Sequence, residues 1–345
     1  YGQSKTMELF LDSVVEEEIK EAFELGFLTG LTTTPTFMHR DGITDVDGTI
    51  VRLSKMVPQI QIEALGESAE EICEEAQRLL GLGLSKETTV LKLPVSLEGV
   101  KACKRLSDED IQVNVHLVYT LQQAYMAMAA GAAYVCPLVG RLQDEGHDAL
   151  GLIEQCVHAV DYYGYGCKVM FSSVRHPEHV RNAINLGVHA VTVPWKVMKG
   201  LTENTFTTVG TQQFFEHTRL MTLCVKDVIS DFNPTIPKGK PVVDALVVMT
   251  RGGFGAVTIV DENDEICGVF TDGDLRRLLE QEGESSLKKP LAELDLKVPI
   301  HISGDTLLLD ASKLLKETQV DTICVVEGKK QIGMLDIQDI IEVTT

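Results

Sequence analysis

Eight short apolar runs, separated by longer amphipathic stretches, constrain the fold of this chain more than any other feature. The runs occupy residues 7–13, 27–34, 60–66, 89–95, 112–120, 134–140, 168–173 and 190–195. Their length and composition are typical of buried strands. Strands that alternate with helices pair in parallel, and eight of them favour a closed (β/α)₈ (TIM) barrel. An open doubly wound sheet is the alternative, but no G-x-G-x-x-G follows the first run.

A second, smaller region follows the barrel region. Residues 254–275 resemble residues 320–340, and each segment predicts a strand, a polar turn, a second strand and a helix that opens with Asp. Such a duplication is typical of a small paired module. The range 230–241 contains three prolines and is predicted to be a linker. We therefore expect a barrel over 7–229 and an α+β pair over 242–345.

Composition narrows the classes of function. The net charge of −20 opposes binding to nucleic-acid phosphates, so a phosphorylated substrate would need a local basic pocket. No apolar run reaches the roughly 18 residues of a membrane helix, and residues 1–6 lack a signal-peptide pattern. The eight cysteines are scattered without a C-x-x-C. We expect reduced thiols, a cytoplasmic protein, no metal and no cofactor.

Lys92 is a charged residue inside an apolar run. Side chains alternate along a strand, so Val90, Lys92 and Pro94 share one face and Lys92 points into the barrel. Apolar surroundings favour the neutral amine, which is the form that attacks a carbonyl. A lysine paired with a buried carboxylate is the alternative, and the strand alone does not decide between the two.

Three more ionisable residues are expected to face the barrel interior near strand ends, where catalytic groups of such barrels lie. Asp12 ends the first run and Glu63 lies in the third. Either carboxylate could exchange a proton with an intermediate, or simply neutralise Lys92. His116 lies in the fifth run, and a single inward histidine is more often a satisfied core residue than a catalyst.

Two arginines follow the sixth and seventh runs. Arg141 comes after Val139-Gly140, and Arg175 comes after Ser172-Ser173. Guanidinium groups on neighbouring loops can hold a phosphate through paired hydrogen bonds. A solvated surface position is the alternative for both arginines.

Six motifs occur in an order and spacing that resemble the transaldolase family, in particular its short branch, which includes fructose-6-phosphate aldolase. The motifs are LFLDS, GLTTTPT, IEALG, LKLPV, VCPLVGRLQDEG and FSSVR, and the resemblance covers roughly residues 7–225. It implies that Lys92 forms a Schiff base, that Asp12 is the acid and base for a substrate hydroxyl, and that Glu63 positions a catalytic water. The substrate-binding positions that it implies are Thr32, Thr33, Thr34, Cys136, Leu138, Arg141, Ser173 and Arg175.

Four positions depart from the family pattern. Thr34 replaces the asparagine that holds a substrate hydroxyl, and His116 replaces the threonine that helps to hold the water. Cys136 replaces a serine or alanine, and Leu138 replaces an aromatic residue. Sites that hydrogen-bond one hydroxyl pattern discriminate against others, so we expect a substrate other than fructose 6-phosphate. His116 could take over the water-holding role with a group that titrates near neutral pH.

The duplicated C-terminal region resembles tandem cystathionine-β-synthase (CBS) domains. Its GVFTDGDLRR segment is similar to the CBS pair of arabinose-5-phosphate isomerases. In such modules a Ser/Thr-x-x-Asp pattern binds a ribose, which implies an effector site at Thr271, Asp272 and Asp274. The second repeat has Asp336 and Asp339 but lacks the hydroxyl, so one nucleotide site is expected to be weaker. A purely structural dimerisation module is the alternative.

These observations lead to two competing hypotheses of function. The first is a Schiff-base aldolase or transaldolase that acts on a sugar phosphate and is regulated by a nucleotide or nucleotide sugar. The second is a non-catalytic sensor that binds a sugar phosphate in a degenerate site. The isomerase-like module also suggests the synthesis of five- or eight-carbon cell-surface sugars, by analogy alone. Both parts resemble modules that assemble, so we expect a homo-oligomer that binds neither nucleic acid nor membranes.

Overall fold

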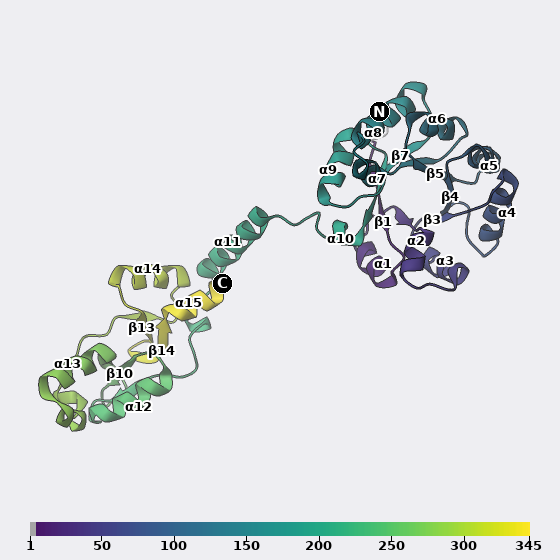
Figure 1. The fold of residues 1–345 in the computed structure, drawn as a ribbon. Coiled ribbons are helices and arrows are strands. Elements are labelled where there is room, and N and C mark those ends of the chain that lie inside the picture. Colours follow the sequence, from purple (N-terminus) through teal and green to yellow (C-terminus); the bar gives the residue numbers. More distant parts are fainter. Residues whose placement is uncertain (1–4) are drawn as a thin grey trace. The chain divides into compact units, whose positions relative to one another are not determined.

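The computed structural model describes residues 5–345, and these form two compact units that divide between Glu203 and Asn204 (Figure 1). The first unit contains a closed barrel of eight parallel strands, in which each strand pairs with its neighbours in sequence order. The strands are β1 (Glu8–Asp12), β2 (Gly30–Thr32), β3 (Ile60–Glu63), β4 (Thr89–Pro94), β5 (Val113–Val118), β6 (Tyr134–Pro137), β7 (Lys168–Phe171) and β8 (Ala190–Pro194). The predicted (β/α)₈ barrel is confirmed.

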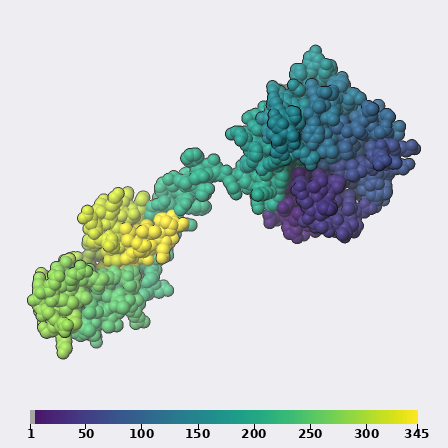
Figure 2. Space-filling view, in the orientation of Figure 1, coloured from purple at the N-terminus to yellow at the C-terminus, as the bar shows by residue number. Residues whose placement is uncertain are grey.

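The barrel closes where β1 pairs with β8, from Glu8 opposite Ala190 to Asp12 opposite Pro194. In the space-filling view the purple N-terminal segment lies against teal residues from the later part of the barrel sequence (Figure 2). Closure leaves no free strand edge, so every backbone donor and acceptor of the barrel strands can find a partner within the ring.

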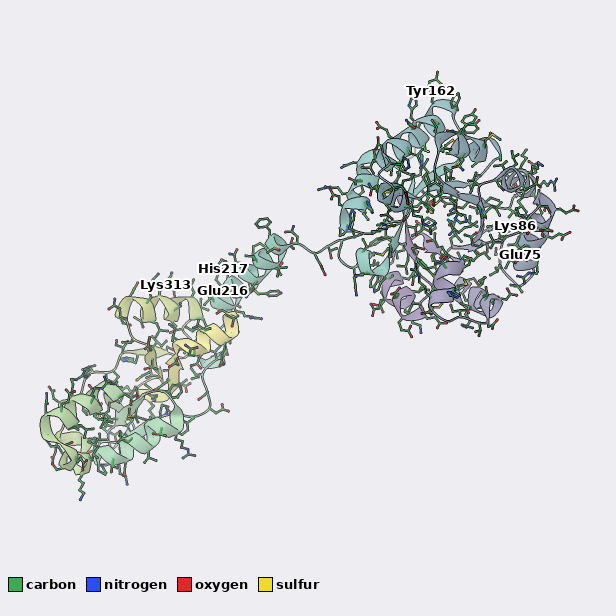
Figure 3. All side chains as sticks on the ribbon, in the orientation of Figure 1. Glu75, Lys86, Tyr162, Glu216, His217 and Lys313 are labelled. Atoms are coloured by element: carbon green, nitrogen blue, oxygen red, sulfur yellow. The ribbon has the colours of Figure 1, made fainter. Side chains whose placement is uncertain are left out.

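Helices connect the barrel strands, and several of them begin at polar capping residues. They are α1 (Glu16–Phe23), α2 (Pro35–Arg40), α3 (Val46–Ser54), α4 (Ala69–Leu80), α5 (Leu97–Asp108), α6 (Leu121–Ala129), α7 (Val139–Asp144), α8 (Ala149–Tyr163), α9 (Pro177–Leu186) and α10 (Trp195–Met198). The hydroxyls of Ser68, Ser96 and Thr120 each accept a hydrogen bond from a first-turn N–H of the helix that follows. The outer residue Tyr162 of α8 points to solvent (Figure 3).

Two apolar clusters stabilise the barrel. The larger one lies between the strands and the surrounding helices and includes Leu91 and Leu93. The smaller one fills the barrel interior and includes Phe10, Val90 and Tyr134. Because these inner side chains close the barrel below Lys92, open space remains only towards the carboxyl ends of the strands, where active sites of this fold lie.

The second unit consists of a long helix and two copies of a small sheet. Its elements are α11 (Thr205–Thr222), η1 (Val225–Asp227), β9 (Thr235–Pro237), α12 (Val242–Gly252), β10 (Ala256–Val260), β11 (Ile266–Thr271), α13 (Asp272–Glu282), η2 (Glu284–Lys288), η3 (Leu291–Glu293), β12 (His301–Ser303), α14 (Leu308–Thr318), β13 (Thr322–Glu327), β14 (Lys330–Asp336) and α15 (Ile337–Thr344). The sheet orders are β11-β10-β9 and β12-β13-β14. In each copy one strand is added in parallel to an antiparallel hairpin.

The predicted internal repeat is confirmed down to an irregularity of register. The first hairpin shifts register between Ile259 and Val260, and the second shifts between Val325 and Val326. Each hairpin is followed by a helix, α13 or α15, and each is preceded by the expected amphipathic helix, α12 or α14. The same fold element has therefore been formed twice from two divergent sequences.

The structure differs from the expected boundaries of 7–229, 230–241 and 242–345 in two respects. Strand β9 lies inside the range 230–241, and it pairs with β10 as part of the first small sheet. Helix α11, which falls within 7–229, packs against α14 and α15 of the second unit. Arg219 of α11 also donates a hydrogen bond of 2.6 Å to the Val343 carbonyl. Neither contact can be read from local sequence, because both join segments far apart in the chain.

Between residues 5 and 345, none of the helices combines the length and the apolar character that a membrane crossing requires.

Candidate active site

A cavity of about 650 Å³ opens at the carboxyl ends of the barrel strands, and we call it the chamber. Its volume is in the range of small-molecule sites. The predicted residues that line it are Asp12, Thr32, Thr34, Glu63, Lys92, His116, Cys136, Leu138, Arg141, Ser173 and Arg175. The closed barrel thus brings together residues that are spread over more than 160 positions of sequence, from Asp12 to Arg175.

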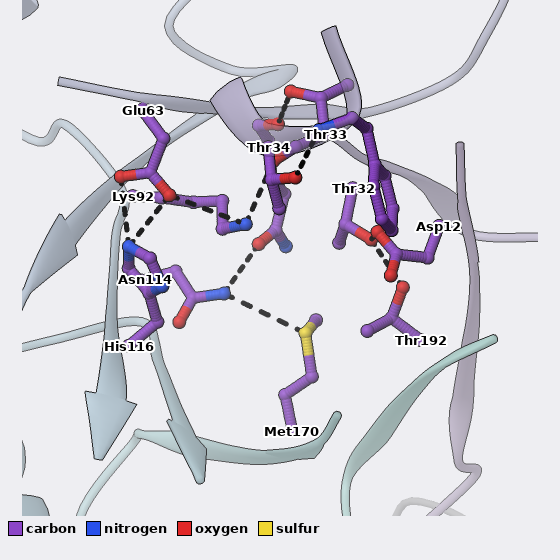
Figure 4. A network of polar contacts seen from close by, with 12 residues as sticks. Asp12, Thr32, Thr33, Thr34, Glu63, Lys92, Asn114, His116, Met170 and Thr192 are labelled. Carbon is purple, nitrogen blue, oxygen red and sulfur yellow. Dashed lines mark hydrogen bonds and ion pairs between the residues drawn. The ribbon is translucent and has the colours of Figure 1, made fainter. Parts of the chain in front are cut away.

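Lys92 lies on β4 with 5% of its surface exposed. Its Nζ donates a hydrogen bond of 2.9 Å to the Thr33 carbonyl, and it lies 3.6 Å from Oε1 of Glu63 (Figure 4). The parallel register places Glu63 directly beside Lys92 on the neighbouring strand. The amine therefore faces an open chamber and also has a carboxylate partner, as each of the two alternatives for this residue requires.

Glu63 and His116 form a buried pair. The Nε2 of His116 lies 2.7 Å and 2.9 Å from the two oxygens of Glu63. Burial lowers the pKa of His116, although the hydrogen bond and the charge of Glu63 act against that shift. Within the described part of the chain, Oε1 of Glu63 has no donor in hydrogen-bond geometry. A buried acceptor of this kind usually has a water or ligand as its partner.

Asp12 ends β1 and lines the chamber, and Figure 4 shows its carboxyl group beside Thr32 and Thr192. Thr32 donates a hydrogen bond of 3.0 Å to Oδ1 of Asp12 and also contacts the hydroxyl of Thr192. Burial raises the pKa of Asp12 to about 6, despite the opposing effects of Lys92 and Thr32. The carboxyl group can therefore take up and release a proton near neutral pH.

The hydroxyls of Thr33 and Thr34, which follow β2, form hydrogen bonds with backbone groups. Thr33 does not line the chamber: its hydroxyl donates to the Gln61 carbonyl at 2.8 Å, and only its own carbonyl reaches Lys92. Thr34 lines the chamber, but its hydroxyl accepts a hydrogen bond from the N–H of Phe37 and caps α2. The expected substrate-binding role of Thr33 is thus reduced to holding Lys92.

Cys136 and Leu138 form part of the chamber wall beside β6. Cys136 is 4% exposed, and burial raises the pKa of its thiol to about 11, so the group is a neutral thiol at physiological pH. Leu138 precedes α7 and presents an aliphatic side chain. This wall therefore contributes apolar surface and a weak hydrogen-bonding group.

The two predicted arginines lie on adjacent loops at one side of the chamber. Arg141 belongs to α7, and Arg175 follows β7 and forms an ion pair with Asp144. Ser173 has a left-handed backbone (φ 59°) beside Gly140. Both arginines also line a neighbouring cavity of about 850 Å³, so an anion between them would be accessible from two directions.

Sequence reasoning missed several chamber residues. They are Phe37, Arg40, Met170, Ser172 and Thr192. Ser172 and Thr192 occupy inward positions near strand ends, so strand parity could have identified them. Arg40 gave no such signal, because it lies at the end of the short helix α2 and not in a strand.

The predicted effector residues of the second unit occur in matching helix caps. Asp274 accepts hydrogen bonds from the backbone N–H and the hydroxyl of Thr271, both at 2.9 Å, and forms an ion pair with Arg277. In the second repeat Asp339 accepts from the Asp336 N–H at 2.8 Å. The residues brought together at each helix start thus have a structural role in the absence of any ligand.

Electrostatics distinguish the two caps. Burial raises the pKa of Asp274, but the hydrogen bonds from Thr271 and Arg277 outweigh it and hold the value below the ordinary one. Burial raises the pKa of Asp339, and the N–H of Asp336 compensates only in part. Asp272, at the start of α13, faces Gly255. The Asp274 carboxyl group of the first cap therefore ionises more readily than the Asp339 carboxyl group of the second.

Comparison with known proteins places the two units in known families. Residues 9–232 match the family model described as Transaldolase/Fructose-6-phosphate aldolase, and residues 225–281 and 291–344 match that of the CBS domain. A probable transaldolase of Coprothermobacter proteolyticus is 40% identical over 208 residues, which are 60% of this chain and 94% of its own. One of Shouchella clausii is 37% identical over 209 residues, which are 60% of this chain and 95% of its own.

Among solved structures, a CBS-domain containing protein from Agrobacterium tumefaciens is similar with a TM-score of 0.32 and 18% identity. The match covers 36% of this chain and 96% of that one.

Proposed function

We propose, since the chain belongs to the transaldolase/fructose-6-phosphate aldolase family, that its barrel is a Schiff-base aldolase or transaldolase that acts on a sugar phosphate. One observation supports this proposal above all others. A buried lysine, Lys92, faces an open chamber together with Asp12 and the Glu63–His116 pair. A nucleophile with separate acid and base groups is the set that imine chemistry requires.

In the first step Lys92 attacks the carbonyl carbon of a ketose phosphate. The new N–C bond gives a carbinolamine, and its oxygen leaves as water once it has received a proton. Glu63 lies 3.6 Å from the Lys92 nitrogen, and its carboxylate oxygens can accept more hydrogen bonds than the contact with His116 uses, so it is suited to hold this water. His116 contacts the same carboxylate and can supply or store the proton.

In the second step Asp12 takes the proton of a substrate hydroxyl. The carbon–carbon bond then breaks, its electron pair moves towards the positively charged imine, and an aldehyde leaves. A base with a pKa of about 6 is ionised at neutral pH and remains able to return the proton. The resulting enamine either gains a proton, as in an aldolase, or attacks a second aldehyde, as in a transaldolase.

Arg141 and Arg175 are proposed to hold the phosphate of the substrate, because both line the same side of the chamber. Their guanidinium groups offer paired donors to a phosphate. The Thr34 hydroxyl accepts a hydrogen bond as a helix cap and keeps its O–H as a donor, and Leu138 offers no hydrogen bond. These two residues therefore support a substrate whose hydroxyl pattern differs from that of fructose 6-phosphate.

The test is borohydride reduction with a panel of ketose and aldose phosphates, followed by intact mass and peptide mapping. We expect a stable adduct on Lys92 with at least one compound, and none in Lys92→Ala. The control is Lys86→Ala, which removes an exposed lysine outside the chamber and should keep the adduct. An adduct with no compound of the panel would contradict the proposal.

A second candidate function is a non-catalytic sugar-phosphate sensor. It is favoured by the loss of hydroxyl contacts around Thr34 and Leu138. A sensor would show ligand-induced thermal shifts without turnover, and turnover that disappears in Lys92→Ala would exclude it.

For the CBS-domain pair we propose binding of a nucleotide or nucleotide sugar at Thr271, Asp272 and Asp274, with a weaker site at Asp336 and Asp339. The ionised Asp274 carboxylate supports this, because a ribose hydroxyl needs an acceptor. Four further expectations remain predictions. They are a CBS pair like that of arabinose-5-phosphate isomerases, a role in cell-surface sugar synthesis, assembly into a homo-oligomer and a cytoplasmic location.

A further inference from the structure

Arg40 lines the chamber on the side opposite to the expected phosphate grip. It ends α2, which follows β2, whereas Arg141 belongs to α7, which follows β6. In the closed order β1 to β8, β2 and β6 are four strands apart and lie on opposite sides of the barrel. Lys92, on β4, lies on the strand midway between them. The chamber therefore has guanidinium groups on two facing rims.

Arg40 is held at this rim without a carboxylate partner. Its guanidinium carbon lies 5.8 Å from the centre of the Phe37 ring, and Phe37 also lines the chamber. Among the ion pairs of residues 5–345, Arg175 is bound to Asp144, but no pair includes Arg40 or Arg141. A cation stacked on an aromatic face keeps its donors available for an anion.

The other charges of the chamber do not neutralise the rims. Its only carboxylates among the residues described are Asp12 and Glu63, and both are already engaged by groups around Lys92. The chain as a whole carries a net charge of −20. A cavity with cations on opposite rims therefore concentrates anions that the rest of the surface repels.

We propose that the chamber takes a ligand with an anionic group at each end, one at Arg141 and Arg175 and a second phosphate or carboxylate at Arg40. This inference rests on the proposed function, because it takes the ligand to be a sugar phosphate. Thr34 lines the same rim as Arg40, and its hydroxyl caps α2. The ligand end near β2 therefore meets the charge of Arg40 beside the single hydroxyl donor of Thr34, where the family resemblance implies an asparagine that holds a hydroxyl.

The test measures equilibrium binding to the full chain by calorimetry, with three probes that have neither an aldehyde nor a ketone group. They are hexyl phosphate, hexane-1,6-diol bisphosphate and 6-phosphohexanoate. We expect both doubly charged probes to bind at least about tenfold more tightly than hexyl phosphate, as a charge-assisted pair provides. The tighter of the two identifies the second group as phosphate or carboxylate.

Variants assign the effect to one residue. Arg40→Gln should remove most of the preference for two charges and leave hexyl phosphate binding unchanged, whereas Arg40→Lys should keep part of it. Arg141→Gln should weaken all three probes. Arg52→Gln, the same charge change on the outer helix α3, is the control and should change nothing.

Equal affinities for one and two charges, or an undiminished preference in Arg40→Gln, would overturn the second anion subsite. Failure of all three probes to bind would overturn the phosphate grip together with it. Because the probes cannot form a Schiff base, a negative result here is distinct from a missing Lys92 adduct. Thermal unfolding of Arg40→Gln, which changes an exposed side chain, verifies that the fold is intact.

Discussion

The buried carboxyl group of Asp12 lowers the stability of the folded barrel when it is ionised. Its carboxyl group is buried, and its pKa rises from the ordinary 3.8 to about 6. The folded state therefore holds the proton more tightly than the unfolded state does. Between these two values the native protein binds more protons, so the stability of the barrel falls as pH rises through this window. Ionised Asp12 destabilises the fold at neutral pH, by roughly 3 kcal/mol for a shift of about two units.

We predict that Asp12→Asn raises the thermal stability of the barrel at pH 7–8, because the amide carries no buried charge. The gain in Tm relative to the unaltered chain should shrink as pH falls from about 7 towards 5, where Asp12 itself becomes neutral. The measurement is thermal unfolding at several pH values. A gain that does not vary with pH would contradict the raised pKa.

The matched control is Asp47→Asn on α3. Hydrogen bonds from Arg78 lower the pKa of this exposed carboxylate, so its ionised form stabilises the fold. The variant should be slightly less stable at neutral pH. The two substitutions therefore have opposite expected signs, although each removes one negative charge.

Helix α7 acts as one element that positions both arginines of the chamber. Arg141 lies in it, and its Asp144 forms the ion pair with Arg175. The Oε1 of its Gln143 lies 2.7 Å from Nε2 of His179, whose Nδ1 accepts a 3.1 Å hydrogen bond from the N–H of Arg175. The helix therefore orients the second arginine through both its side chain and its backbone.

We predict that Gly140→Ala weakens binding of inorganic phosphate about tenfold, which is about 1.4 kcal/mol and within the usual cost of overpacking. An added Cβ would lie 2.4 Å from the Ser173 carbonyl oxygen and 3.0 Å from Nε of Arg175, so the arginine must move. Trapping of dihydroxyacetone on Lys92 should change little, because that ketone has no phosphate.

Gly166→Ala is the control, because no atom lies within 4 Å of the added Cβ. Phosphate titration of the two variants should separate them. Equal phosphate affinities in both would show that α7 does not set the position of Arg175.

At the scale of the whole molecule, a catalytic-type barrel and a paired CBS module share one chain. Helix α11 falls within the transaldolase match but packs on α14 and α15. The solvent-exposed surface of this helix carries large apolar side chains: Phe206 is 87% exposed and Phe214 is 74% exposed. The helix that ends the barrel sequence is thus physically part of the second unit.

We predict that the two CBS repeats differ in nucleotide affinity. Asp274→Asn should reduce the affinity of the full chain for AMP, ATP or a CMP-sugar by about tenfold or more, because a charged acceptor is lost. Asp339→Asn should have a smaller effect, since its carboxyl group is less readily ionised and lacks a neighbouring hydroxyl. Calorimetric titration measures both. Equal losses in the two variants would contradict a single dominant site.

The sequence by itself determined the elements and the direction of their side chains. Strand positions follow from local apolar runs, and strand parity places Lys92 and Glu63 inside the barrel, as the structure shows. The duplicated sheets were equally local, because each hairpin and its helix lie within about 25 residues of sequence. The motifs also indicated the family that the comparisons confirm.

Only the tertiary structure decided which of these groups meet. His116 reaches Glu63 across 53 positions, Arg175 reaches Asp144 across 31, and β9 joins a sheet from within an apparent linker. Arg40 became a chamber residue because barrel closure sets α2 opposite α7. The contacts inside the barrel depend on its register and closure, whereas the pairing of β9 depends on the packing of the second unit. A local pattern along the chain carries no record of either.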